Sequence, residues 1–315
     1  MPTDSEADLR RKAEGGDAEA ALALGRRLLI GQDAPFKPQE GMQWVGRAAE
    51  AGDAEAMVLA ATLAAAGVGR PRDWDVALNG LRAAADAGHQ SAAAQLEVIT
   101  SAFPTVAAWL APPARTPVCD APRVRTIAGF LPPGVCRWLM DRAAPHLAPA
   151  TRFNPETGRS EPHPGRTNDI FVIDVLRSDV VGALVRARIS AALDMPTACF
   201  EPTQMLRYRP GQEFAPHFDF VAPGDFTAYD TGKAYEGQRI VTFLVYLNDD
   251  FEGGETAFPR ADLKVRGKTG EAVFFANVGL DQKPDKSSLH AGLPPTRGEK
   301  WVLSQWIHDR PFTAV

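Results

Sequence analysis

Cysteine is scarce in this sequence: three residues among 315, an odd number with no C-x-x-C spacing. That usage predicts neither a disulfide framework nor a zinc site, and it fits a reducing compartment. The sequence also lacks any apolar run of about 18 residues, which argues against a membrane span. Its acidic N-terminus is not followed by the apolar segment of a signal peptide. We therefore expect a cytoplasmic protein.

The charge of the chain is nearly balanced. The net charge is −5, and no long basic run occurs, so neither nucleic acid nor an anionic membrane is expected as a partner. The hydrophobic content of 45% and the charged content of 23% are typical of ordinary globular proteins. A length of 315 residues exceeds one typical domain of about 100–200 residues, which predicts two domains.

The first hundred residues repeat with a period of 36. Gly16, Gly52 and Gly88 share this spacing, and so do Gly31 and Gly67. Each unit has the pattern of two short alanine-rich helices that end at glycine. Since one such unit cannot bury its apolar face alone, the period predicts a solenoid of stacked helices.

The repeated pattern A-x-x-L-G…G…A-x-x-x-x-x-x-A-A-x-x-G, over roughly residues 8–100, resembles the Sel-one-like repeats, relatives of the tetratricopeptide repeats. The resemblance implies an array of helical hairpins that makes protein contacts. The alternative is that the array only stabilises or spaces the second domain. Both interpretations stay open at the level of sequence.

The pattern changes after the repeats. Clustered prolines predict a linker, two later segments have helical patterns, and from Thr203 onward short strands with a period of two suggest a jelly roll. The predicted helices lie in "FLPPGVCRWLMDRAAPHL" and "SDVVGALVRARISAAL", and the clearest strands in "RIVTFLVYL", "EAVFFANV" and "KWVLSQWIH". The predicted domains are 1–100 for the repeats, 101–123 for the Pro-rich linker and 124–315 for the second domain.

The segment "APHFDF", residues 215–220, places His217 and Asp219 two residues apart in what reads as a strand. Side chains at that spacing point to the same face, so the imidazole and the carboxylate could share one metal ion. Two histidines and one carboxylate on one face typically bind non-haem iron(II) with positions left open. His290, which precedes a later strand, is the candidate third ligand. Surface or capping roles are expected for three other histidines: His89, His146 and His163.

Five motifs in order carry a family resemblance over roughly residues 124–310: "LRYRPGQEFAPHFD", "RIVTFLVYLND", "GGETAFP", "GEAVFFAN" and "SLHAGLPPTRGEKWVLSQW". They resemble the iron(II)- and 2-oxoglutarate-dependent dioxygenases of the prolyl 4-hydroxylase type. The resemblance implies an α+β domain with a double-stranded β-helix core, a variant of the jelly roll. It implies Fe(II), 2-oxoglutarate and O2, with ascorbate as a candidate further cofactor, and it assigns His217, Asp219 and His290 to the metal.

The same resemblance assigns the co-substrate contacts. Lys300, ten residues after His290, would pair with the far carboxylate of 2-oxoglutarate. Tyr208 and Thr242 resemble residues that hydrogen-bond 2-oxoglutarate, with core or ladder packing as the alternative. No catalytic residue beyond the metal centre is expected.

Substrate contacts are expected from three residues. Trp306 shares a strand face with Lys300, because an even offset preserves the side. It resembles the tryptophan that lines the peptide channel, with an ordinary core aromatic as the alternative. Arg239 could contact the substrate or pair with a carboxylate. Phe214 stands where the family often has tyrosine. The loop 221–238 has the composition of a lid, Glu255 is expected to be structural, and "GRTN" at 165–168 would lie near the substrate entrance.

The function implied by the resemblance is hydroxylation of prolyl residues in a peptide or protein, using O2 and releasing succinate and CO2. A hydroxylase of a free amino acid or another small metabolite would need the same iron site. An oxygen- or 2-oxoglutarate-responsive interaction protein is an alternative of a different class, in which the repeats recruit a partner. The retained ligands and lysine favour an enzyme, and a broad repeat surface favours a protein substrate.

Overall fold

The structure is a computed structural model that describes residues 4–154, 157, 159–162, 165–221 and 237–311. The chain forms two compact units, Met1–Ala111 with Asp174–Arg188 and Pro112–Ile173 with Ile189–Val315. The first unit is thus longer than the predicted repeat domain, 1–100, and includes a segment from much later in the sequence. Among the described helices, none combines the length and the apolar character needed to cross a bilayer.

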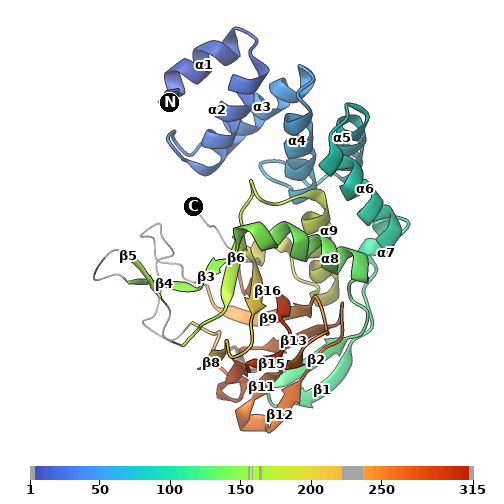
Figure 1. Ribbon diagram of the computed structural model, residues 1–315, viewed down its shortest axis with the longest axis vertical. Helices are drawn as coiled ribbons and strands as arrows, with labels where there is room; N and C mark the ends of the chain where they lie inside the picture. The colour runs from blue at the N-terminus through green and yellow to red at the C-terminus, as the bar shows by residue number, and fades with distance from the viewer. Residues whose placement is uncertain (1–3, 155–156, 158, 163–164, 222–236, 312–315) are drawn as a thin grey trace. The chain divides into compact units, whose positions relative to one another are not determined.

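The first unit contains a succession of short helices, each packed against the next, as the repeats predict (Figure 1). Its core consists mostly of alanine and leucine side chains from neighbouring helices. Trp44 and Val45 also belong to this core. The helices are α1 (Glu6–Glu14), α2 (Ala18–Ile30), α3 (Pro38–Glu50), α4 (Ala54–Ala66), α5 (Trp74–Asp86), α6 (Gln90–Ala102) and α7 (Val106–Leu110).

The helix ends reproduce the 36-residue period. Asp17, Asp53 and His89 are the N-cap residues directly before three helices, and their side chains accept hydrogen bonds from the backbone N–H three residues later. Gly31 and Gly67 end α2 and α4 with φ values of 69° and 73°, a left-handed conformation that glycine adopts without strain. The expected capping role of His89 is confirmed.

Glycines allow α2 and α3 to approach closely. A Cβ atom added at Gly41 would lie 2.8 Å from the carbonyl oxygen of Gly25, and one added at Gly25 would lie 2.8 Å from that of Gly41. We expect Gly41→Ala to lower the free energy of unfolding by about 1–3 kcal/mol, because it forces two packed backbones apart. Gly46→Ala is the matched control on α3, since nothing lies within 4 Å of the added atom.

Gly46→Ala is expected to raise the free energy of unfolding by about 0.5–1 kcal/mol through helix propensity. Urea unfolding followed by circular dichroism measures both changes. Equal shifts in the same direction for the two variants would contradict the close-packing explanation.

The second unit contains α8 (Pro133–Ala143), as predicted, and an eight-stranded antiparallel major sheet (Figure 1). The predicted helix α9 (Val180–Leu193) is also present, and the division between the units falls within it. In spatial order the major sheet consists of β1 (Thr116–Asp120), β2 (Arg123–Ile127), β13 (Ala272–Ala276), β9 (Arg239–Tyr246), β16 (Lys300–His308), β7 (Thr203–Tyr208), β6 (Asp169–Ile173) and β3 (Ala148–Pro149).

A four-stranded antiparallel minor sheet shares its core with the major sheet. Phe258 from the minor sheet packs edge-on against Phe275 of β13, with ring centroids 5.0 Å apart. These two sheets confirm the predicted jelly-roll class. The minor sheet consists of β12 (Leu263–Val265), β11 (Thr256–Phe258), β14 (His290–Gly292) and β8 (Phe214–His217), and separate ribbons pair β10 (Glu252–Gly253) with β15 (Pro295–Arg297) and β4 (Thr151–Asn154) with β5 (Arg159–Pro162).

The segment 101–123, predicted as a linker, contains regular structure. It holds α7 and also β1, which pairs with β2 at the edge of the major sheet. Strands also occur before Thr203, where none was predicted. Such strands are short and some contain proline, so they show little period-two signal, and only their pairing with longer strands identifies them.

Candidate active site

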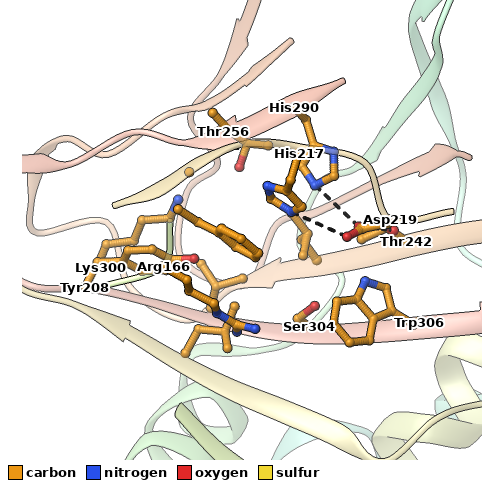
Figure 2. Close-up of a pocket in the computed structure, with 16 residues that line it drawn as sticks. Arg166, Tyr208, His217, Asp219, Thr242, Thr256, His290, Lys300, Ser304 and Trp306 are labelled. Atoms are coloured by element: carbon orange, nitrogen blue, oxygen red, sulfur yellow. Dashed lines mark hydrogen bonds and ion pairs between the residues drawn. The ribbon is translucent and has the colours of Figure 1, made fainter. Parts of the chain in front are cut away.

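Two paired strands of the minor sheet bring the predicted metal ligands together. β8 and β14 pair in a register that sets His217 opposite His290. Asp219 lies two residues beyond the end of β8, so it is not on the strand as the sequence suggested. The carboxylate nevertheless faces both rings: Oδ1 lies 3.4 Å from Nε2 of His217 and Oδ2 lies 3.3 Å from Nε2 of His290 (Figure 2).

Backbone carbonyls determine which imidazole nitrogens face Asp219. Nδ1 of His217 lies 2.8 Å from the carbonyl oxygen of Ala215, and Nδ1 of His290 lies 3.0 Å from that of Ser288. Because a carbonyl only accepts, each Nδ1 carries the proton and each Nε2 presents a lone pair. The local backbone therefore prepares both rings as ligands.

The charge states of these groups also suit a metal. Burial, followed by the neighbouring His290, lowers the pKa of His217 and favours its neutral ring. One ligand atom from each of the three residues fits within 4.8 Å. Two imidazoles and one carboxylate fit iron(II) of the facial-triad type.

A pocket extends from this cluster along the major sheet. β16 contributes alternate residues to it, Lys300, Val302, Ser304 and Trp306, which confirms that Lys300 and Trp306 share one strand face. The remaining lining residues are Arg166, Leu206, Tyr208, Phe214, His217, Asp219, Thr242, Leu244, Thr256, His290, Ala291 and Gly292.

Lys300 lies toward the opposite end of the pocket from Asp219 (Figure 2). Its side chain is buried, with Nζ 5.0 Å and 5.3 Å from the ring centroids of Tyr208 and Tyr246. Within the described part of the chain, no carboxylate forms an ion pair with it. Burial lowers the pKa of Lys300 to about 7, against a smaller opposing effect of Glu255. A buried cation of this kind can bind an anionic group that enters the pocket.

The two residues predicted to hydrogen-bond 2-oxoglutarate differ in their surroundings. Tyr208 pairs in register with Lys300, and burial raises its pKa to about 12, so its hydroxyl stays protonated. Its hydrogen bond to 2-oxoglutarate stays a prediction. Thr242 instead donates its hydroxyl proton to Oδ2 of Asp219 over 2.6 Å, so the same proton is not available to the co-substrate.

The predicted substrate residues separate into two groups. Phe214 stacks on the ring of His217 with centroids 3.5 Å apart, and Trp306 lies across from Thr242 in the sheet register; both line the pocket. Arg239 pairs with a carboxylate, one of the two alternatives: its guanidinium makes two hydrogen bonds to the buried carboxylate of Glu201, 2.5 and 3.2 Å long. It also lies 3.7 Å from the ring centroid of Trp306. The contact of Arg239 with the substrate stays a prediction.

Sequence reasoning missed several residues near the pocket. Arg166 is a buried cation on the wall, 4.7 Å from the ring centroid of Phe214, and Nε donates to Asn168 over 3.0 Å. The sequence signal that could have identified Arg166 was the polar "GRTN" segment, which contains it. Glu201 and His308, which form a 2.5 Å hydrogen bond, carried no signal because their positions in the sequence are far apart.

Two predicted features concern loops. Gly253 and Gly254, in "FEGGETAFP", have φ values of 67° and 68°, which confirms a tight glycine turn. A Cβ atom at Gly254 would lie 3.3 Å from Cδ of Lys300, so this glycine also leaves room for the lysine. Most of the predicted lid, residues 222–236, lies outside the described residues, as does His163.

Residues 203–308 match the family model of the 2OG-Fe(II) oxygenase superfamily. The chain is therefore a dioxygenase that uses iron(II), 2-oxoglutarate and O2. The protein named Prolyl 4-hydroxylase 1 from Arabidopsis thaliana is 32% identical over 232 residues, which span 69% of this chain and 76% of that protein. The chain accordingly belongs to the prolyl 4-hydroxylase family.

Other similar proteins cover part of the chain. Prolyl 4-hydroxylase subunit alpha-1 of Rattus norvegicus is 32% identical over 202 residues, which cover 64% of this chain and 37% of that subunit. A viral collagen prolyl hydroxylase from Paramecium Bursaria Chlorella virus-1 aligns with a TM-score of 0.46 and 28% identity, over 61% of this chain and 98% of that one. A Sel1 repeat protein from Oxalobacter formigenes aligns with a TM-score of 0.28 and 32% identity, over 29% and 68%.

Proposed function

We propose that this dioxygenase hydroxylates prolyl residues in a peptide or protein. The observation that carries the proposal is the similarity to a plant prolyl 4-hydroxylase over 76% of that protein's length. The pocket supports it, because a metal-ligand cluster, a buried cation and an aromatic wall lie along one cavity. His217, Asp219 and His290 would hold iron(II), and Lys300 would bind the far carboxylate of 2-oxoglutarate.

The bound iron supplies the oxidising chemistry, by which one oxygen atom of O2 enters a C–H bond of the substrate and the other enters succinate as 2-oxoglutarate loses CO2. The protein contributes position and environment. Lys300 holds the co-substrate by charge, and the carbonyls behind His217 and His290 keep both imidazoles in the ligating tautomer. Phe214 and Trp306 give the cavity apolar walls that exclude water and suit the ring of a proline.

The test is succinate formation from 2-oxoglutarate by the purified chain with Fe(II), with and without proline-rich peptides. We expect these peptides to stimulate turnover and to gain one oxygen atom by mass spectrometry. Peptides with alanine in place of proline should do neither, and the His217→Ala variant should be inactive. Turnover that no proline peptide stimulates, together with oxygen incorporation into a free amino acid, would contradict the proposal in favour of a small substrate.

We further propose that the helical repeats recruit a protein substrate. Two exposed apolar side chains support this: Phe36 is 49% exposed and Val76 is 44% exposed. In the same assay, Phe36→Ser should reduce turnover of a protein substrate and leave turnover of a short peptide cut from it unchanged. Equal effects on both substrates would indicate that the repeats only stabilise or space the oxygenase.

Two finer expectations remain proposals. Ascorbate should prolong turnover in this assay if it keeps the iron reduced, and a time course that is unchanged by ascorbate would remove it from the cofactors. A cytoplasmic location is supported by the free thiols of Cys119, Cys136 and Cys199. Fractionation of cells that express the tagged chain tests the location.

A further inference from the structure

A chain of two hydrogen bonds leads from the metal-ligating carboxylate into the core. Oδ2 of Asp219 accepts from the hydroxyl of Thr242 over 2.6 Å, and that hydroxyl oxygen accepts from Nδ2 of Asn277 over 3.0 Å. Thr242 lies on β9, a central strand of the major sheet, and Asn277 directly follows β13, the neighbouring strand. All three side chains are buried, with Asn277 0% exposed.

The direction of these hydrogen bonds follows from the chemistry of the groups. A ligating carboxylate is deprotonated and only accepts, so the Thr242 hydroxyl must donate to Asp219. The hydroxyl has one proton, so it can only accept from Asn277. Asn277 must therefore present its amide nitrogen, and it directs the threonine proton toward the carboxylate.

Asn277 is held firmly in this place. Its backbone N–H donates to the carbonyl oxygen of Ile240 over 2.9 Å, and its carbonyl oxygen accepts from the N–H of Asp285 over 2.9 Å. Its side-chain Oδ1, however, has no hydrogen-bond partner among the described residues. Burial of an unpartnered amide oxygen costs stability, so stability does not explain why an amide is placed here.

We propose that Asn277 and Thr242 are positioning residues for the metal centre. They hold Asp219 by its Oδ2 atom, which leaves Oδ1, beside His217, as the oxygen presented to the ion. Partners behind a metal ligand orient it and tune its affinity, and their loss typically costs about 10–100-fold. This inference rests on the metal centre of the proposed function and is independent of the prolyl substrate.

Manganese(II) binding to the full chain, measured by electron paramagnetic resonance without 2-oxoglutarate or peptide, tests the role of Thr242. We expect Thr242→Val to weaken binding about 10–100-fold and Thr242→Ser, which keeps the hydroxyl, to bind within a few fold of the original protein. Thr203→Val is the matched control, because it also removes a buried strand hydroxyl, one that donates to Gln305 over 2.7 Å. The control should bind manganese(II) normally.

A second pair of variants tests whether Asn277 acts on Asp219 through Thr242. Asn277→Leu should weaken manganese(II) binding, and Asn277→Leu combined with Thr242→Val should be no weaker than Thr242→Val alone, because Asn277 acts only through the threonine. The proposal is overturned by normal binding in Thr242→Val, by an equal loss in Thr203→Val or Thr242→Ser, or by fully additive losses in the double variant. Since no substrate is present, none of these outcomes depends on which substrate the enzyme uses.

Discussion

Replacing Asp219 with asparagine is expected to reduce succinate formation below detection. The substitution keeps the shape of the side chain but removes the only negative charge of the ligand cluster His217, Asp219 and His290. Mutation of a residue behind a metal ligand typically lowers metal affinity about 10–100-fold. Mutation of a ligand itself should have a larger effect, so the affinity for manganese(II) should fall by more than about 100-fold. Titration of manganese(II) and a succinate assay measure the two effects.

Glu213→Gln is the matched control for this substitution. Glu213 is an exposed carboxylate six residues before Asp219, and its hydrogen bonds to Thr167 use only its backbone atoms. The control should retain metal binding and turnover. An Asp219→Asn variant that still bound manganese(II) as tightly as Glu213→Gln would show that the ion does not depend on this carboxylate.

Replacing Lys300 with alanine is expected to raise the KM for 2-oxoglutarate by about 30-fold or more. Removing one partner of a buried charged pair costs about 2–5 kcal/mol, and Lys300 is the one lysine among the described residues that line the pocket. Arginine should restore little, because its planar group is larger and a Cβ at Gly254 would already lie 3.3 Å from the lysine stem. Lys264→Ala, an exposed lysine on β12, is the control.

The binding of 2-oxoglutarate should also depend on pH. Burial lowers the pKa of Lys300 to about 7 in the ligand-free protein, so the amine is mostly neutral at pH 8. A carboxylate binds the charged form, so binding above pH 7 must take up a proton, and the affinity should fall by up to about tenfold per pH unit. Below pH 7 the lysine is already charged, and this dependence should level off.

Isothermal titration calorimetry at pH 8, in buffers that differ in ionisation enthalpy, measures this proton uptake directly. The observed heat should change with the buffer in the original protein and not in Lys300→Ala at matched saturation. A heat that is the same in all buffers would show that Lys300 is charged before the co-substrate binds.

The candidate metal ligands could be predicted because they lie in short motifs. His217 and Asp219 are two residues apart, and His290 is the histidine before the last long strand. The sequence placed both of the first two on a strand, whereas β8 ends at His217. The prediction of a shared site still held, since Asp219 follows the strand closely enough for its carboxylate to reach both imidazoles.

The roles of Thr242 and Arg239 could not be read in the same way. Each has a partner that is distant in sequence: Thr242 lies against Asp219 and Asn277, and Arg239 lies against Glu201. A strand pattern indicates which side chains face inward, but it does not say which strands are neighbours. Sheet order and register decide these partners.

The helical repeats and the jelly-roll class could be predicted from the sequence, because the repeats have a fixed spacing and the strands a period of two. The candidate metal ligands and the lysine could be predicted because they lie in short motifs that resemble a known family. Three features are visible only in the folded chain: the first unit includes residues 174–188, segment 101–123 contains a strand of the major sheet, and Asp219 is held through Thr242 and Asn277. The physical reason is that burial and hydrogen-bond partners depend on contacts between distant segments, and a chain leaves few local traces of those contacts.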